Sequence, residues 1–600
     1  MASLRVSVVL ALAVTLFTSP VYADDPVVEI KSGKLGGKSV EFSHSDIDVQ
    51  RTVHVFKGIP YAEPPVGDLR FQPPKPKVPW EGVHNAANFG SACMQSIEPL
   101  VPVQEPLSED CLFLNVYAPQ VDDSASLPVM VWIHGGAFII GSGGFRYDGT
   151  ALAATGDVIV VSINYRLGPF GFLATGDEHT AGNYGFYDQI AALRWVQDNI
   201  AAFGGDATKV TIFGESAGAI SSEYLFLSPL TDGLFRRVIL QSGSASLPGF
   251  VSTDTATQNK IAHGLGKLLG CDEDSSDELV KCLRTVPAED FIEPSDMSSG
   301  LLANVTGLDF EIESSPFPPV VDGKFVTEAP ATLIRERNFN KKDIDFMIGT
   351  LSDEGMTYCM FFMADKLNQT EVTMDRDTYE ALYPAVLTKR FKNNPAVLDA
   401  IKLLYVNWED ADVEDADYVE AFSHMQGDQF FVCRADQSAR AYSLAGANVY
   451  LYQITHAPAK SIWPCTWLKA AHMEEIPFVF GWHFVQEMEW TMPKEDVDLA
   501  VEIMKYWTNF AKTGNPNSPS SNDDDSQTSW PLFKVPGLEY KDLSLKMETK
   551  RALKAKECAF WNDFIPKLMK HTDSDSICSA VDDDLHLQKY KEEANVDPSQ

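Results

Sequence analysis

The chain has 600 residues, of which 45% are hydrophobic and 22% charged, a balance typical of a globular protein with a large core. Its formal net charge is −36 at pH 7, and such acidity repels phosphate backbones, which argues against nucleic acid as a partner. A negative charge can attract cationic substrates, but many exposed acidic side chains on a solvated surface give the same net charge. The charge alone therefore does not identify a substrate.

Residues 1–23 have the pattern of a secretory signal peptide. A charged start at Arg5 precedes an apolar run from Val6 to Phe17 and a small-residue cleavage site at Ala23. No segment of the chain reaches the roughly 18 uninterrupted apolar residues that a membrane-spanning helix requires. Residues 592–600 are polar and lack the hydrophobic tail of a lipid-anchor signal. We therefore expect a secreted, extracellular protein without a membrane anchor.

A secretory route is oxidising, so most of the nine cysteines are expected to form disulfides, and the odd number leaves at least one unpaired or intermolecular. Two glycosylation sequons, beginning at Asn304 and Asn368, fit the same route.

The chain alternates expected strands and helices. Apolar runs at 128–133, 158–163 and 210–213 each precede a turn that contains glycine, and further strands are expected at 238–241, 344–348 and 449–454. Between the second and third runs, Ile190, Leu193 and Val196 are spaced for one buried helix face. The pattern predicts an α/β fold with a large, mostly parallel sheet covered by helices on both faces, and ligands at the carboxyl ends of its strands.

Neither an internal repeat nor a shift in composition marks a second core, so one domain is expected over residues 24–570. Residues 515–528 form a polar loop in this reading, and residues 571–600 form an acidic, mobile tail.

Ser216 is the candidate nucleophile. It lies in Gly214-Glu215-Ser216-Ala217-Gly218, between the strand at 210–213 and a run compatible with a helix. A serine on a sharp strand-to-helix turn is exposed above the sheet, and glycines tolerate the crowding around it. The alternative is an ordinary glycine-rich turn, but the strand before it and the helix after it favour the nucleophile.

A second motif, His134-Gly135-Gly136-Ala137-Phe138, follows the earlier strand that ends at Ile133. Hydrolases that carry such a serine turn place oxyanion donors at this position. We predict that the backbone N–H groups of Gly136, Ala137 and Ala217 stabilise the oxyanion, with support from the dipole of the helix after Ser216.

A serine hydroxyl needs a base, and this type of fold supplies its partners in the order serine, acid, histidine. The strand at 344–348 leads to the adjacent carboxylates Asp353 and Glu354, and spacing does not choose between them. His456 and His472 both follow the strand at 449–454. Pattern alone leaves both pairs open.

At this point the sequence resembles the type-B carboxylesterase and cholinesterase family of α/β-hydrolases over nearly the whole mature chain. The motifs that carry the resemblance are Phe56-Lys-Gly-Ile-Pro-Tyr-Ala62, Ser108-Glu-Asp-Cys-Leu-Phe-Leu-Asn115, Asn164-Tyr-Arg-Leu-Gly168, Gly204-Gly-Asp206 and Leu240-Gln-Ser-Gly243. The resemblance implies a serine carboxylesterase domain in which Glu354 is the acid and His472 the base. His456 then becomes a structural histidine.

In this mechanism His472 takes the proton of Ser216 and returns it to the leaving alcohol, while Glu354 fixes the histidine tautomer. Glu215 either tunes the electrostatics of the site or has a structural role. The reaction requires no metal or cofactor, and the twelve histidines show no His-Glu-x-x-His spacing, so neither is predicted.

The resemblance also implies disulfides that join Cys93 to Cys111, Cys271 to Cys282 and Cys433 to Cys558. Cys359, Cys465 and Cys578 remain, and Cys578 is a candidate for an intermolecular bridge. Arg70 with Glu109, and Arg166 with Asp188, resemble buried ion pairs of the family that hold the fold.

Cholinesterases hold a quaternary ammonium on an aromatic face, chiefly a tryptophan in the loop that corresponds to residues 93–111. Here residues 94–110 contain no aromatic side chain, which disfavours acetylcholine. The segment before Val320, which shapes the acyl pocket in the family, contains a single aromatic residue rather than an aromatic cluster. It consists of Glu313, Ser314, Ser315, Pro316 and Phe317, and we therefore expect a roomier acyl site. The expected substrates are uncharged carboxylic esters.

The alternatives are a hormone methyl-ester esterase, a lipid-ester hydrolase and a cholinesterase-like enzyme. A non-catalytic adhesion module of the same fold is disfavoured, because Ser216, Glu354 and His472 are all present and no membrane-spanning segment is found.

Overall fold

The computed structural model describes residues 25–97, 103, 106–122, 124–296, 299–308, 310, 315–339, 341, 343–517 and 529–572. The expected signal peptide, Glu313, Ser314, Cys578 and most of the expected polar loop and tail lie outside these residues. Within the described ranges, none of the helices is both long and apolar enough to cross a bilayer.

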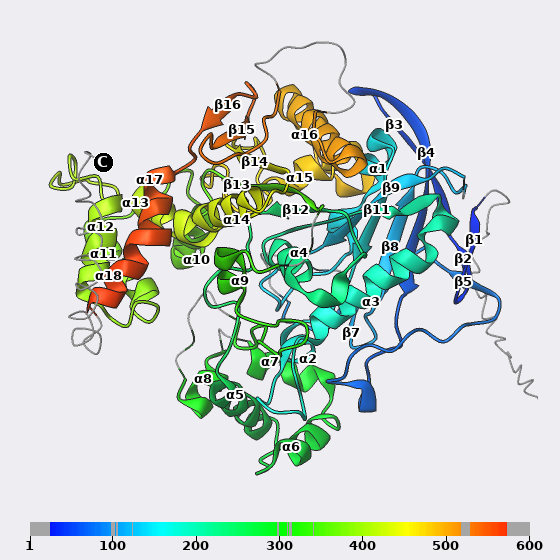
Figure 1. The fold of residues 1–600 in the computed structure, drawn as a ribbon, viewed down its shortest axis with the longest axis horizontal. Helices are drawn as coiled ribbons and strands as arrows, with labels where there is room; N and C mark the ends of the chain where they lie inside the picture. The colour runs from blue at the N-terminus through cyan, green and yellow to red at the C-terminus, as the bar shows by residue number, and fades with distance from the viewer. Residues whose placement is uncertain are drawn as a thin grey trace, which may run out of the picture.

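An 11-stranded sheet forms the centre of the molecule, in the order β16-β15-β14-β13-β12-β11-β9-β10-β8-β4-β3 (Figure 1). Its strands are β3 (Lys38–His44), β4 (Ile47–Pro60), β8 (Phe113–Ala118), β9 (Leu127–Ile133), β10 (Ile159–Ile163), β11 (Gly205–Glu215), β12 (Arg237–Gln241), β13 (Asp345–Leu351), β14 (Val449–Ile454), β15 (Glu539–Leu543) and β16 (Thr549–Arg551). The strands from β10 to β15 pair in parallel, whereas β3, β4, β8 and β16 add antiparallel edges. This architecture confirms the predicted α/β-hydrolase fold class.

Two hydrophobic cores cover the two faces of this sheet, as strand β9 illustrates. Val131 and Ile133 pack into one core together with helices α3 (Tyr184–Asn199) and α4 (Ala217–Leu227). Met130 and Trp132 pack into the other core with α1 (Thr150–Gly156) and α16 (Lys494–Thr513). Because successive side chains of a strand point to opposite faces, a strand covered on both sides is apolar throughout. This explains the continuous apolar runs of the sequence.

The remaining α-helices surround these layers: α2 (Gly168–Phe172), α5 (Thr255–Leu268), α6 (Ser276–Leu283), α7 (Ile292–Ser295), α8 (Leu301–Thr306), α9 (Pro330–Glu336), α10 (Met356–Phe362), α11 (Arg376–Leu387), α12 (Pro395–Tyr405), α13 (Val419–Gly427), α14 (Cys433–Leu444), α15 (Ile476–Val479), α17 (Ala555–Ala559) and α18 (Ile565–Thr572). Helix α3 buries Ile190, Leu193 and Val196, the expected helix face, and its first turn, from Tyr184, is also largely buried.

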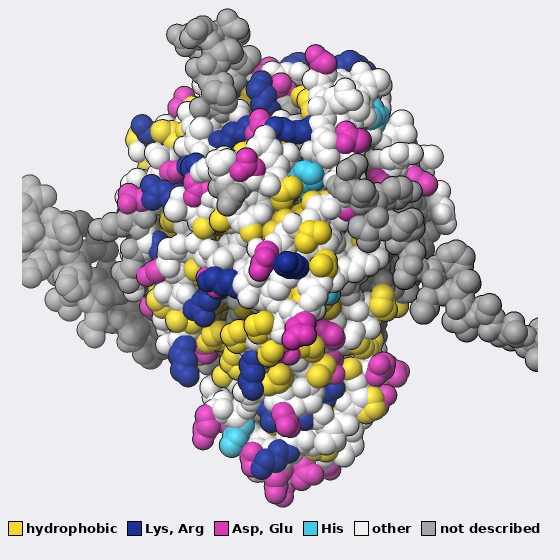
Figure 2. All heavy atoms as spheres, turned by 90° about the vertical axis from the view of Figure 1, so that its right-hand side faces the viewer, with side chains coloured by type: hydrophobic (Ala, Val, Ile, Leu, Met, Phe, Trp, Pro, Cys, Tyr) yellow, Lys and Arg dark blue, Asp and Glu magenta, His cyan; other side chains and the backbone are white. Residues whose placement is uncertain are grey.

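Two small sheets lie outside the central one. Strands β1 (Val27–Ile30), β2 (Gly33–Gly36) and β5 (Val83–Asn85) form the first, and β6 (Ala92–Cys93) pairs with β7 (Leu107–Ser108) in the second. On the side of the molecule nearest β1, β2 and β5, basic and acidic side chains intermingle around a group of apolar ones (Figure 2). No basic stripe is visible on that face.

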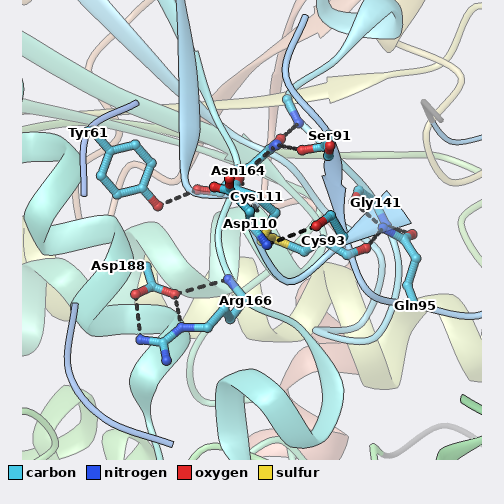
Figure 3. The surroundings of a disulfide bond; sticks show 12 residues. Tyr61, Ser91, Cys93, Gln95, Asp110, Cys111, Gly141, Asn164, Arg166 and Asp188 are labelled. Carbon is cyan, nitrogen blue, oxygen red and sulfur yellow. Dashed lines mark hydrogen bonds and ion pairs between the residues drawn. A yellow bond between two sulfur atoms is a disulfide. The ribbon is translucent and has the colours of Figure 1, made fainter. Parts of the chain in front are cut away.

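Three disulfides join the pairs that the family resemblance implied: Cys93–Cys111, Cys271–Cys282 and Cys433–Cys558. Cys359 and Cys465 are buried free thiols. The two implied ion pairs are also present. Arg70 Nε donates to Glu109 at 2.7 Å, and the buried Arg166 guanidinium donates to both oxygens of Asp188 at 2.7 Å (Figure 3).

Candidate active site

Ser216 occupies a strained turn between β11 and α4. Its backbone angles are φ 55° and ψ −122°, a conformation that side-chain-bearing residues rarely adopt. The chain is crowded on both sides of it. A Cβ atom on Gly218 would lie 1.9 Å from the carbonyl oxygen of Ile133, and one on Gly214 would lie 2.5 Å from the same oxygen. Only glycine fits at these two positions, which explains the Gly-x-Ser-x-Gly pattern physically.

The glycine loop after β9 meets this turn. A Cβ atom on Gly135 would lie 3.1 Å from Ser216 Cβ, so the two motifs are in contact. Gly136 and Ala137 both have positive φ, at 99° and 53°. Within the described chain, the N–H groups of Gly136, Ala137 and Ala217 donate to no other residue. Three backbone donors are therefore unused around the candidate nucleophile.

The loop closed by the Cys93–Cys111 disulfide supports the end of the glycine loop (Figure 3). Gln95 Nε2 donates to the carbonyl oxygen of Gly141 at 2.8 Å, and Gln95 Oε1 accepts from the N–H of Gly141 at 2.7 Å. On the other side, the Tyr165 hydroxyl donates to the carbonyl oxygen of His134 at 2.9 Å. Burial lowers the pKa of His134 to about 4, so this histidine stays neutral and structural.

The structure brings Glu354 and His472 together. Glu354 follows β13, and its Oε2 accepts from His472 Nδ1 at 2.7 Å. Its other oxygen accepts from the N–H of Leu351 at 2.8 Å and from the Ser242 hydroxyl. These bonds use both oxygens and fix the carboxylate beside the histidine ring.

The alternatives left open by the sequence lie elsewhere. The Asp353 carboxylate accepts from the Ser352 hydroxyl at 2.6 Å rather than from His472. His456 Nε2 lies 2.6 Å from Asp496, and the second oxygen of Asp496 accepts from the N–H of Ala459 at 2.9 Å. His456 therefore holds the segment after β14, as the resemblance implied.

Glu215 lies on the opposite side of the His472 ring. Its Oε1 is 2.9 Å from His472 Nε2, but the contact lacks hydrogen-bond geometry, and both Glu215 oxygens are without a hydrogen-bond partner in the described residues. His472 Nε2 makes no hydrogen bond with Ser216 in this structure. Such catalytic bonds often align only when substrate binds. The candidate base His472 is thus enclosed by two carboxylates.

These charges change the ionisation of the site. Burial alone lowers the pKa of His472, but Glu215 and Glu354 outweigh it and raise that pKa well above its ordinary value. Burial raises the pKa of Glu215, against the opposing effect of His472. Before substrate binds, these charges therefore favour a protonated His472 imidazole.

A third buried carboxylate, Glu475, adds to this cluster. Burial, together with Glu215, raises its pKa to about 8. Gln241 Nε2 donates to Glu475 at 3.0 Å, and Gln241 Oε1 accepts from the Trp507 indole at 2.9 Å.

Reasoning from the sequence did not identify Ser242, Gln241 or Glu475 as part of the site. Ser242 and Gln241 lie in the Leu240-Gln-Ser-Gly243 motif that carried the family resemblance, and Glu475 is three residues after His472. That motif was the available signal, but it did not reveal which carboxylates these side chains contact.

Comparisons with known proteins agree with this geometry. The model of the carboxylesterase family matches residues 24–561. The chain is 36% identical over 535 residues to acetylcholinesterase of Bungarus fasciatus, covering 87% of this chain and 84% of the relative. It is 38% identical over 563 residues to carboxylesterase 5A of Felis catus, covering 91% of this chain and 95% of the relative. The chain therefore belongs to the carboxylesterase family and is a carboxylic ester hydrolase.

Proposed function

We propose that the protein is a secreted serine esterase that hydrolyses uncharged carboxylic esters through an acyl-enzyme on Ser216. The observation that carries the proposal is the 2.7 Å contact between Glu354 and His472 Nδ1, next to a strained serine turn. A carboxylate on Nδ1 leaves Nε2 as the basic atom of a neutral ring.

The reaction begins when neutral His472 takes the hydroxyl proton of Ser216 through Nε2. The serine oxygen attacks the ester carbonyl, and the N–H groups of Gly136, Ala137 and Ala217 stabilise the resulting oxyanion. His472 then returns the proton to the leaving alcohol, and water hydrolyses the acyl-enzyme by the same steps. Nε2 must first leave Glu215 and turn to Ser216.

The walls of the site support an uncharged substrate. No aromatic residue occurs between Met94 and Asp110, so the disulfide loop offers no ring face to a quaternary ammonium. The Phe431 ring lies 4.5 Å from the His472 ring, and Phe317, in the segment expected to shape the acyl site, is buried. These apolar side chains favour a neutral ester.

Secretion and glycosylation are further parts of the proposal. The leader-like residues 1–23 and the three disulfides support an oxidising route. Asn304 and Asn368 both lie on the surface, where an oligosaccharide can be attached. Enzymatic deglycosylation of protein purified from culture medium should reduce its mass, and Asn304→Gln with Asn368→Gln should abolish that reduction.

Hydrolysis of an ester panel tests the function. The panel contains a neutral short-chain ester, acetylcholine, a long-chain glyceride and a methyl ester, with Ser216→Ala beside the native enzyme. The neutral short-chain ester should give the highest kcat/KM, and Ser216→Ala should lose nearly all turnover. Unchanged turnover in this variant would overturn the mechanism. Preference for acetylcholine, the glyceride or the methyl ester would overturn the substrate class.

A further inference from the structure

A cavity of about 920 Å³ opens between α10, α13 and the segment 457–469, which we call the lateral cavity. None of its lining residues belongs to the serine turn or the glycine loop. It lies on the side of the molecule that carries α11, α12 and α13 (Figure 1). Its volume is within the range, roughly 300–1,000 Å³, of pockets that hold small organic ligands.

The floor of the lateral cavity is apolar. Met356, Val419, Trp467 and Leu468 line it and are all buried. The Trp467 side chain is only 7% exposed, and its indole N–H has no acceptor within the described chain. The N–H itself is not accessible, so the floor offers a bound molecule the apolar surface of the Trp467 ring.

The rim of the lateral cavity is negatively charged. Glu371, Asp410 and Asp415 line it, are exposed, and form no ion pair with any cation in the described residues. Glu420 is the carboxylate that is neutralised, by Lys469 at 3.0 Å. His424 adds no positive charge, because burial lowers its pKa. The rim therefore has an excess of negative charge that attracts a cation.

The spacing of these carboxylates favours an organic cation over a metal ion. A metal ion requires several ligand atoms close to one point. Among the described residues, only His44, Asp46 and His483 place three such ligand atoms within 4.8 Å of one another. These three residues lie outside the lateral cavity. That group is also occupied by its own bonds. Because His483 Nδ1 accepts from the N–H of Met492, its Nε2 carries a proton and donates to Asp46 at 2.9 Å.

We propose that the lateral cavity binds a cationic amphiphilic small molecule, with a protonated amine at the carboxylate rim and an apolar, ring-containing body on the Trp467 floor. Binding of this molecule does not depend on the proposed function.

The wall of the lateral cavity is connected to the catalytic base. The Trp463 indole, in the segment 457–469, donates to the carbonyl oxygen of His472 at 2.9 Å. The N–H of Ile462 donates to Glu474 at 3.2 Å, two residues after His472. Met356 begins α10 only two residues after Glu354. A ligand that orders these walls should therefore alter hydrolysis, and this second part rests on the proposed function.

Binding is tested by isothermal titration with two probes of matched shape, 2-(1-naphthyl)ethylamine and 2-(1-naphthyl)ethanol, on the Ser216→Ala variant at pH 7. The amine should bind about tenfold more tightly than the alcohol. In the Ser216→Ala background, Asp410→Asn with Asp415→Asn should weaken the amine about fivefold to tenfold and leave the alcohol within about twofold.

A matched control removes two exposed carboxylates near β4 and β5, by Asp48→Asn with Glu81→Gln in the same background. These strands lie at the opposite end of the molecule from α12 and α13 (Figure 1). The control pair should leave both affinities unchanged. Equal binding of amine and alcohol, no binding, or equal losses in the two double variants would each overturn the site. Melting temperatures within a degree of the parent show that the exposed substitutions leave the fold intact.

The connection to His472 has its own readout. In the native enzyme, kcat for a neutral ester should change with amine concentration and saturate at the concentration that saturates binding. The change should shift to higher amine concentration in Asp410→Asn with Asp415→Asn. Binding without any change in kcat would overturn the connection while leaving the site intact. Failure of the hydrolytic proposal would appear instead as turnover by Ser216→Ala, which leaves the titrations unaffected.

Discussion

Glu215 Oε1 lies 2.9 Å from His472 Nε2, the atom that takes the proton of Ser216 in the proposed mechanism. Glu215, the neighbour of the candidate nucleophile, thus competes with Ser216 for the proposed base. Because Glu354 holds Nδ1 on the other side of the ring, the two carboxylates stabilise a protonated His472, which is the inactive form for the first proton transfer.

Glu215→Gln should therefore shift the acid limb of the pH–kcat/KM profile to lower pH. The Glu215 anion raises the pKa of His472, so its removal lowers that pKa and leaves the ring neutral over a wider acidic range. Rates for a neutral ester between pH 4 and 9 check this direction. An acid limb that keeps its midpoint, or moves to higher pH, contradicts it.

Ser242→Ala should lower kcat about tenfold with little change in KM, because the Ser242 hydroxyl is one of the donors that orient Glu354. Ser244→Ala is the matched control. The Ser244 hydroxyl bonds to Ser246 and Ser438, at 2.9 and 3.1 Å, and not to Glu354. Steady-state kinetics of the two variants should differ. Equal losses would show that the whole segment, rather than the bond to Glu354, matters.

Gly135→Ala should reduce kcat/KM about 10²–10³-fold, the loss typical of an oxyanion donor that is displaced. The added Cβ would lie 2.7 Å from Glu215 Oε2 and 3.1 Å from Ser216 Cβ, so the glycine loop must move away from the serine turn. Gly233→Ala serves as the control, since a Cβ there meets no atom within 4 Å and only its positive φ is strained. Near-native kinetics for Gly135→Ala would show that the loop plays no part in oxyanion binding.

The stability of the Glu475→Gln variant relative to the native protein should increase as pH rises. Burial raises the pKa of Glu475 in the folded state to about 8 from an ordinary value of 4.5. The stabilising contribution of the protonated acid is complete below pH 4.5 and is lost as pH rises toward 8, because the unfolded chain ionises first. Glutamine does not titrate. The difference in melting temperature, variant minus native, should increase between pH 5 and pH 8, and a constant or falling difference contradicts the burial argument.

The central strands were predictable because each is covered on both faces. The expected runs at 128–133 and 449–454 match β9 and β14 to within one residue, since continuous apolar residues mark such strands directly. The antiparallel strands β3, β4 and β16, and the parallel strand β15 beside the edge, were not predicted. Their side chains are partly exposed or polar, as in β16, where every residue is exposed, and periodicity then carries little signal.

The residues of the candidate site also fall into those that the sequence reveals and those that it does not. Ser216 is visible in the sequence because its turn imposes glycines at 214 and 218, and the glycine loop is visible for a similar steric reason. The choice of Glu354 over Asp353, and of His472 over His456, came from family resemblance rather than from spacing. Nothing local distinguishes these residues, because their partners are distant in the chain. His472 and Glu354 are 118 residues apart.

The sequence by itself identified a candidate nucleophile and a candidate oxyanion loop, and it determined the α/β architecture and the family, because each depends on local sterics, on local motifs or on the apolar period of a single element. Only the tertiary structure decided that His472 lies between Glu354 and Glu215, that Ser242 and Gln241 contact buried carboxylates, and that an acidic cavity opens behind the segment leading to His472. Parallel strands bring their carboxyl ends to one edge of the sheet, and contacts made there join residues that no pattern along the chain connects.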